Sequence, residues 1–380
     1  MDDCGSPARL KSLDTLKGTI ITAIVCVHLL IARDSGDSGD PSLFLQYFYL
    51  GLMFFFICSG YFYRPERGFA RNIRGRLVQL LLSLCICGVV LSVVLFLEAS
   101  ILWEMPSGED FLYALGRAFC LHDIGQPIAD NMICPVSGAS MGYYYIWTMF
   151  WSFMIFYSVI TFVDDDDRKT VGAILILLAI QALFVEFLAI QVPFYFNLSP
   201  FGAALMFAGR LLAKRSAFNR IESCPRKDPK FWLLLAVCAV SALILVIVFQ
   251  PGIIWDKMYY GEYGWASVFP FYIEAILVTF VLVYLAMLFA RIPLVSKVLL
   301  LAGRHSLGLL LLHCFVAKFI LLLFNEPVTY TWFPPTDTPV TVAVVLLMYA
   351  ITLTSCEMYT RRRAKACSAP ENGKTFNREP

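Results

Sequence analysis

Residues 16–32 read LKGTIITAIVCVHLLIA, an apolar run about as long as a helix needs to cross a hydrocarbon core roughly 30 Å thick. Similar runs recur along the chain, and 59% of its 380 residues are hydrophobic while 15% are charged. A soluble domain of this composition would leave a large apolar surface in water. The sequence therefore predicts a protein whose surface is solvated by lipid.

Roughly ten such runs predict an all-α polytopic membrane protein with about ten transmembrane helices, since none shows the alternation of a membrane barrel. The runs lie near 16–32, 43–63, 77–99, 141–163, 171–190, 196–213, 231–250, 266–290, 299–324 and 338–358. Residues 16–358 form the predicted transmembrane domain, between an N-terminal tail at 1–15 and a polar tail at 359–380. The longest connection, at about 100–140, is expected outside the cell as a partly folded cap or re-entrant element.

Lysine and arginine predict the orientation, because the insertion machinery leaves them on the cytoplasmic side. If the N-terminus is inside, 26 of the 30 basic residues fall in cytoplasmic segments. Both termini are therefore expected in the cytoplasm, and the protein in a cell membrane of the bacterial cytoplasmic type, in contact with membrane lipids. The formal net charge of +2 is uninformative, and no nucleic-acid partner is expected.

The twelve cysteines do not form a disulfide framework, because most lie in predicted spans or on the reducing side of the membrane. Cys120 and Cys134 share the predicted external loop, where they could pair or stay reduced. No metal site is expected, since Cys85 and Cys87 are too close together and lie within a span. The acidic run Asp164–Asp167 is interpreted as a solvated loop rather than as a metal site.

Polar residues in the first span are the sharpest candidates for chemistry, because such residues are costly inside a membrane. Asp14, Lys17 and His28 stand there. Lys17 and His28 are about three turns apart, so they share a helix face at a separation of roughly 16 Å along the axis. A neutral imidazole can accept a proton from a hydroxyl, and a cation near the inner edge suits a phosphorylated ligand. The alternative is a histidine bonded between helices and a lysine that reaches the interface.

The second span ends in FFFICSGYFYRPERGFARNIRGRL, residues 54–77. Ser59 and Gly60 there would allow close approach of another helix. Arg71 and Arg74 are spaced to share one helix face, and paired guanidinium groups bind phosphates well. A basic loop that serves topology alone is the other interpretation.

Three segments resemble motifs of one family. The segment SLDTLKGTIITAIVCVH, residues 12–28, is similar to an L-D-x-L-[RK]-G opening followed by histidine. The segment FFFICSGYFY, followed by Arg71 and Arg74, is similar to an F-F-F-x-S-G motif with R-x-x-R on the next helix. The segment GRHSLGLLLLH, residues 303–313, is similar to a late G-[KR]-x-S-L signature that ends in histidine. YYYIWTMFW around Trp147 is a weaker match.

In this order, the motifs resemble the membrane-bound acyltransferase-3 family of O-acyltransferases over about residues 9–320. The resemblance implies transfer of an acyl group, usually acetyl, from cytoplasmic acyl-CoA, such as acetyl-CoA, to a hydroxyl of an extracytoplasmic carbohydrate or envelope glycan. It implies that His28 is the catalytic base and that Lys17, Arg71 and Arg74 bind the CoA phosphates. The further catalytic candidates are Asp14, Ser306 and His313. The candidates for substrate contact are Ser59, Tyr61, Trp147, Glu186 and Glu274.

Several alternatives stay open. Ser306 and His313 are about two turns apart and could serve only interhelical hydrogen bonding. Glu186 and Glu274 could orient a histidine, contact substrate or face a water-filled cavity. Lys17 replaces the arginine of many members and lacks its bidentate fork. No hydrolase-like domain follows the last span, which suggests that a separate extracytoplasmic transferase, or the membrane unit itself, completes transfer.

The rival class is a transporter or flippase of glycan or lipid intermediates, because buried histidine, glutamate and basic residues also suit a translocation pathway. Its usual signs are inverted repeats and helices broken in matching halves, and neither is clear in this sequence. A catalytically inactive relative that acts as a sensor is a third possibility.

Overall fold

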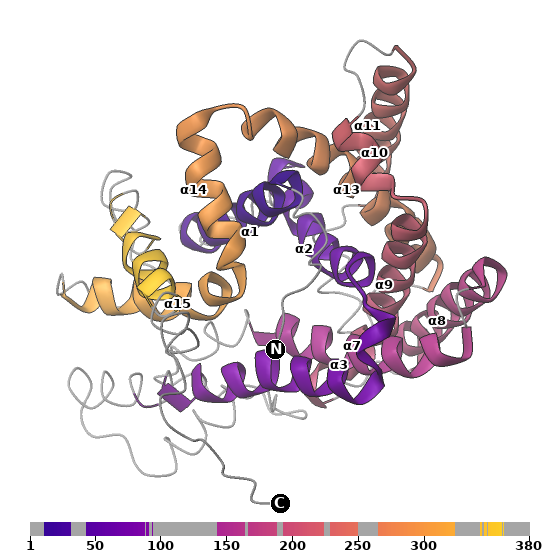
Figure 1. Cartoon of the computed structure of the whole chain (residues 1–380), viewed down its shortest axis with the longest axis horizontal. Helices are drawn as coiled ribbons and strands as arrows, with labels where there is room; N and C mark the ends of the chain where they lie inside the picture. Colours follow the sequence, from indigo (N-terminus) through magenta and orange to yellow (C-terminus); the bar gives the residue numbers. More distant parts are fainter. Residues whose placement is uncertain are drawn as a thin grey trace, which may run out of the picture.

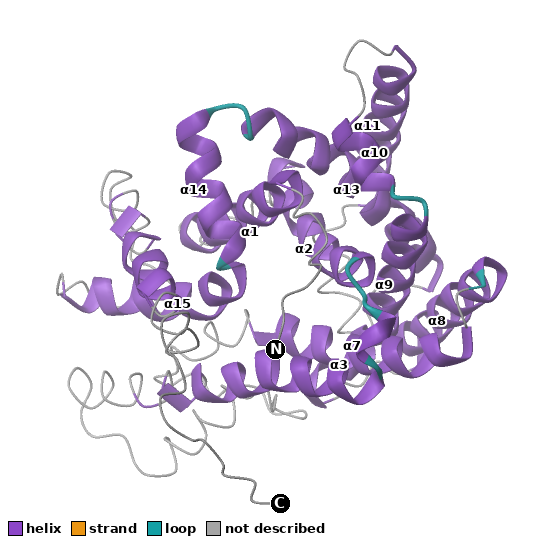
Figure 2. Ribbon diagram, in the orientation of Figure 1, coloured by secondary structure: helices purple, strands orange, loops and turns teal. Residues whose placement is uncertain are grey.

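The computed structural model describes residues 11–31, 43–87, 89–90, 93, 143–163, 166–187, 193–223, 229–249, 265–323, 343, 346–347, 349–358 and 360. Within these ranges every regular element is helical and there is no strand (Figure 2). The predicted external loop with Cys120 and Cys134, the polar tail beyond residue 360 and the N-terminal residues 1–10 lie outside the described ranges.

The helices follow the predicted apolar runs closely. They are α1 (Lys11–Ile31), α2 (Leu43–Tyr61), α3 (Phe69–Arg76), α7 (Tyr143–Val163), α8 (Asp167–Phe187), α9 (Ser199–Lys214), α10 (Ala217–Ser223), α11 (Pro229–Phe249), α13 (Val268–Phe289), α14 (Pro293–Arg304) and α15 (Ser306–Leu323). Shorter elements are η1 (Pro65–Arg67), η2 (Leu77–Leu82), η4 (Pro193–Leu198) and η5 (Trp265–Ser267).

Three of the described helices are long and apolar enough to cross a membrane, within Tyr145–Val163, Asp167–Phe187 and Val268–Phe289. The bent pair α14 and α15 makes a fourth if it is one span. The outer faces of α8 and α13 carry exposed apolar side chains, namely Leu175, Ile176 and Leu183 on α8 and Ile273, Leu285 and Phe289 on α13. Such a face is suited to lipid. The helical membrane class is thus confirmed, whereas the number of about ten spans and the side of each terminus stay predictions.

One predicted span is wrong as a single helix. The run at 299–324 is divided between α14 and α15, which meet at an angle of 78°. His305 stands at the corner with φ −110° and ψ 22°, outside the helical region, although its N–H still bonds to the carbonyls of Leu301 and Ala302. Apolar residues continue across the corner, so hydropathy alone does not reveal the bend.

Two pairs of helices, α1 with α14 and α2 with α9, pack backbone to backbone (Figure 1). Helix α1 lies against α14, where a Cβ at Gly18 would overlap the carbonyl of Leu299 and a Cβ at Gly303 would overlap that of Asp14. Helix α2 lies against α9 in the same way, through Gly60 and Gly209. The predicted close approach at Gly60 is confirmed, and small residues at such crossings are typical of membrane helices.

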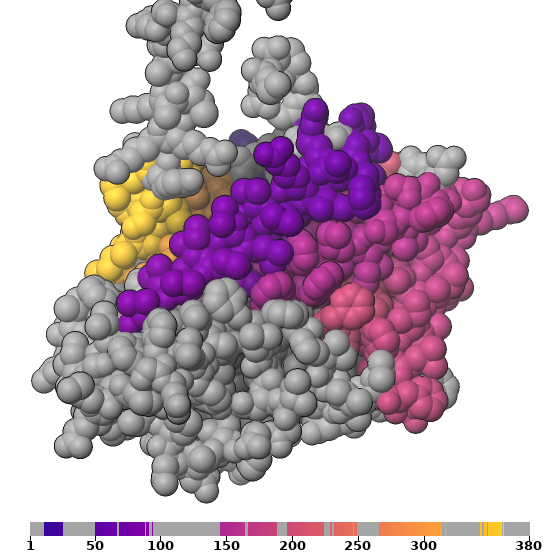
Figure 3. Space-filling view, turned by 90° about the horizontal axis from the view of Figure 1, so that it is seen from below, coloured from indigo at the N-terminus to yellow at the C-terminus, as the bar shows by residue number. Residues whose placement is uncertain are grey.

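Helix α3 continues without interruption into the π-helical segment η2. The two form a ridge that runs diagonally across the face shown in Figure 3, beside α7. Leu80 and Leu84 are buried under this ridge, whereas Val78 and Leu82 are exposed. A π-helical turn inside an α-helix is rare and is often found at functional sites.

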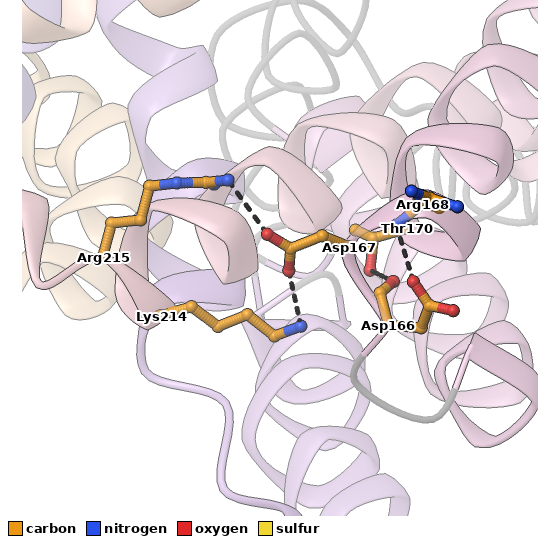
Figure 4. A network of polar contacts seen from close by, with 6 residues as sticks. All are labelled: Asp166, Asp167, Arg168, Thr170, Lys214 and Arg215. Atoms are coloured by element: carbon orange, nitrogen blue, oxygen red, sulfur yellow. Dashed lines mark hydrogen bonds and ion pairs between the residues drawn. The ribbon is translucent and has the colours of Figure 1, made fainter.

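Asp166 and Asp167 belong to the acidic run for which the sequence predicts a solvated loop, and both are exposed at the start of α8 (Figure 4). A side-chain oxygen of Asp166 accepts a hydrogen bond from the backbone N–H of Arg168 at 2.8 Å, which caps the start of α8. Asp167 accepts hydrogen bonds from Lys214 and Arg215, both at 2.9 Å. These exposed ion pairs join the start of α8 to the end of α9, and they are worth little individually because solvent screens them.

Replacing Gly209 by alanine tests the backbone contact between α2 and α9. The added methyl group meets the carbonyl of Ile57, so we expect the free energy of unfolding to fall by about 1–3 kcal/mol. The matched control is Gly172→Ala on α8, where nothing lies within 4 Å of the added Cβ and alanine favours the helix. Thermal unfolding of the purified protein measures both, and equal midpoints for the two variants would contradict the packing argument.

Candidate active site

A cavity of about 330 Å³ lies between the helices that carry the three sequence motifs. It is lined by residues of α1, α2, α3, η2, α7 and the corner between α14 and α15. Four of the predicted site residues line it, namely Asp14, Lys17, Ser59 and Ser306. The fold therefore brings the first, second and third motifs together, although their lining residues are as far as 296 residues apart in sequence (Asp14 to Leu310).

Three cations gather at this cavity, and they come from three different segments. Lys17 lies on α1, Arg76 at the end of α3 and Arg304 at the end of α14. One carboxylate accompanies them, since Asp14 lies 3.7 Å from the ammonium of Lys17. Three cations against one carboxylate favour an anionic ligand, and guanidinium groups match the geometry of phosphate oxygens.

The guanidinium group of Arg76 is held in place by three neighbours. It lies 4.4 Å from the centre of the Phe153 ring, donates to the side-chain oxygen of Gln79 at 2.8 Å and approaches the Tyr157 hydroxyl at 3.5 Å. The ammonium of Lys17 lies 5.4 Å from the centre of the Phe62 ring. Stacking on aromatic faces reduces the freedom of these cations before a ligand binds.

The cavity walls beyond the cations are mainly apolar. They are formed by Ile21, Leu52, Phe55, Leu80, Met149, Phe153, Leu307 and Leu310. Tyr145 from α7 donates from its hydroxyl to the carbonyl of Leu52 on α2 at 3.2 Å, which joins these two walls. A ligand with a charged end and a less polar arm would match this distribution of charged and apolar groups.

Ser59 and Ser306 supply hydroxyl groups to the cavity. The Ser59 hydroxyl donates to the carbonyl of Phe55 in its own helix at 2.7 Å. Its oxygen can therefore still accept a hydrogen bond from a ligand. Ser306 begins α15 directly after the corner, so its position depends on the bend.

The backbone of His28 lies in α1, and its side chain lies outside the described part of the structure. Asp14, Lys17 and Ile21 line the cavity at a helical spacing of three and four residues. Position 28 follows Ile21 by seven residues, about two turns or roughly 10 Å, and is on the same face of the helix. The backbone therefore places His28 about two turns beyond Ile21, the last residue of α1 that lines the cavity.

The other predicted site residues do not line the cavity. Arg71 and Arg74 are exposed on α3, and Glu186 is exposed on α8. Tyr61 is half-buried, with its ring 4.7 Å from that of Phe218. Trp147 is buried within α7.

His313 is buried on α15, outside the cavity lining. Its Nδ1 lies 2.8 Å from the carbonyl of Leu310 and 3.0 Å from that of Leu309. A carbonyl only accepts, so Nδ1 carries a hydrogen and Nε2 is the proton acceptor of the neutral ring. The hydrogen bond within its own helix thus fixes the tautomer of His313.

Glu274 is fully buried on α13. Neither of its carboxyl oxygens has a hydrogen-bond partner among the described residues. A buried polar group left in this state costs free energy, and such groups inside membrane proteins often mark a functional position. Glu274 does not line the described cavity.

Arg76, Arg304 and Gln79 line the cavity but are not among the site residues that the sequence predicts. Arg76 belongs to a row of residues four apart that continues through Leu80 and Leu84, and both leucines are buried. Arg74 belongs to the neighbouring row, which continues through the exposed residues Val78 and Leu82. The spacing of four residues in each row can be read in the sequence. Both rows are apolar, however, so composition could not show which one faces lipid and which one faces protein.

An all-helical bundle with lipid-compatible faces and a cavity lined by cations defines a membrane protein with a polar site between its helices. The sequence profile of the acyltransferase-3 family, described as an acyltransferase domain, matches residues 10–356, so the chain belongs to this family and is a membrane-associated acyltransferase. No curated protein and no solved structure matches the chain.

Glu274 offers a test that separates stability from function. Glu274→Leu removes the buried polar oxygens, so we expect a higher unfolding midpoint together with a large loss of acyl transfer. Glu274→Gln should lose transfer without the gain in stability. Thermal unfolding and turnover are measured on the same preparations. Full activity in both variants would show that Glu274 has no role in the reaction.

Proposed function

We propose that the protein is an O-acyltransferase that moves an acetyl group from cytoplasmic acetyl-CoA to a hydroxyl of an extracytoplasmic carbohydrate or envelope glycan. The observation that carries the proposal is the cavity in which Lys17, Arg76 and Arg304 converge beside apolar walls. Phosphates of CoA suit the cationic end, and the less polar pantetheine arm suits the walls.

The orientation predicted from basic residues places this cationic end at the cytoplasmic side, where acyl-CoA is present. From there α1 leads along one face from Lys17 past Ile21 to position 28. In this proposal the donor enters at the cations and its thioester lies near His28. The acceptor hydroxyl approaches from the opposite side of the membrane.

The chemistry requires one proton transfer and one acyl transfer. The acceptor oxygen attacks the thioester carbonyl carbon, a C–O bond forms and the C–S bond to CoA breaks. His28 takes the proton from the hydroxyl and returns it to the leaving thiolate of CoA. Proton transfer of this kind contributes on the order of 10² to 10⁴ in rate, and the remainder comes from positioning of the two substrates.

His28→Ala is the direct test of the reaction. Inside-out membrane vesicles receive radiolabelled acetyl-CoA, and label in the glycan fraction is measured. We expect transfer to be abolished, because no other base is assigned to the hydroxyl proton. The control is Thr161→Ala, an exposed position of α7. Undiminished label transfer by His28→Ala would refute the enzyme mechanism, and movement of intact glycan without label would favour the transporter.

A second prediction distinguishes Arg76 from its neighbours. Arg76→Ala should raise the dissociation constant of CoA about tenfold or more, because a charged hydrogen bond is worth roughly 1.5–3 kcal/mol. Arg71→Ala and Arg74→Ala should have smaller effects, since neither residue lines the cavity. Lys169→Ala, an exposed cation of α8, is the control. Isothermal titration with CoA measures all four, and equal losses for the three arginines would contradict the assignment of Arg76.

A further inference from the structure

We infer that Glu357 is a positioning residue that acts through His305 to hold the corner between α14 and α15 against the cavity. The inference rests on the proposed function, because the consequence of the contact is the placement of Arg304 and Ser306 toward the acyl donor. Glu357 belongs to the last described helical segment and is 52 residues beyond His305 in the sequence.

The corner is a point where a small rotation has a large effect at the cavity. Arg304 and Ser306 flank His305 on its two sides, and both line the cavity. The His305 N–H closes α14, and its carbonyl accepts from Leu309 at 2.9 Å to open α15. The backbone of His305 is thus bonded to both helices, and its side chain adds a contact between the corner and a later part of the chain.

The side chain of His305 makes that connection. Its Nε2 donates to a carboxylate oxygen of Glu357 at 3.2 Å. The imidazole is largely buried, with 12% of the side chain exposed, so the hydrogen bond is shielded from solvent on one side. Glu357 is more exposed, at 34%, which limits the strength of the contact as an ion pair.

The helix that carries Glu357 is itself docked on the bundle. Tyr349 and Leu353 are buried at a spacing of four residues, and Glu357 continues the same stripe. One turn along α15, a Cβ at Gly308 would lie 2.7 Å from the sulfur of Cys356. Among the described residues, a polar contact and a steric contact therefore both hold the end of this helix against the corner.

The test is a double-mutant cycle on donor binding and turnover. His305→Ala and Glu357→Ala are each expected to raise the KM for acetyl-CoA about three- to tenfold with little change in kcat, which corresponds to the loss of one hydrogen bond. The double variant should be no worse than the more impaired of the two single variants, because the contact between the two side chains is already lost in each of them. Glu357→Gln keeps an oxygen acceptor and should restore most of the affinity.

Thr354→Ala, exposed on the same helical segment, is the matched control, and unfolding midpoints are recorded for every variant. A merely structural role would lower the midpoint and the active fraction while leaving KM unchanged, and that result overturns the inference. Additive effects of the two single variants overturn it as well.

If the wild-type protein transfers no acetyl group and binds no CoA, the proposed function fails and the positioning role fails with it. A wild-type enzyme that is active, with variants of unchanged KM, rejects the positioning role alone.

Discussion

The contact between the backbones of α1 and α14 is the constraint on which the rest of the site depends. Gly18 and Gly303 are the residues that let these helices approach so closely. Because the helices touch, Asp14 and Lys17 on one of them lie beside Arg304 on the other, and a cavity that joins the first and third motifs can form. Any side chain larger than hydrogen at either glycine would push the two motifs apart.

The fold class was readable from the sequence because lipid imposes a simple requirement on it. A span needs a long apolar run with its backbone bonded internally, so the positions of most helices follow from hydropathy. The corner at His305 was missed for the same reason. Its flanks are as apolar as those of an unbroken helix, and the bend depends on backbone angles that composition does not encode.

The candidate site was predicted in part. Asp14, Lys17, Ser59 and Ser306 belong to recognisable motifs, and the cavity includes all four. Arg76 was missed although it is two residues from Arg74, because the choice between the two depends on which face of the α3 ridge meets protein. In a soluble protein the face that meets solvent would be polar and the face that meets protein would be apolar. In a membrane protein both faces are apolar, so the sequence does not distinguish them. The role of His28 stays a prediction, since its side chain lies outside the described part of the structure.

The π-helical segment Leu77–Leu82 affects the direction in which the Arg76 side chain leaves its helix. A π-turn behaves as an α-helix with one residue inserted. Each residue of an α-helix turns the chain by about 100°, so deletion of a single residue in this segment would rotate α3 by roughly that angle relative to the buried leucines beyond it. The guanidinium group would then turn away from Phe153 without any change in the residue itself. The angular position of this cation is therefore determined by the length of the segment that follows it.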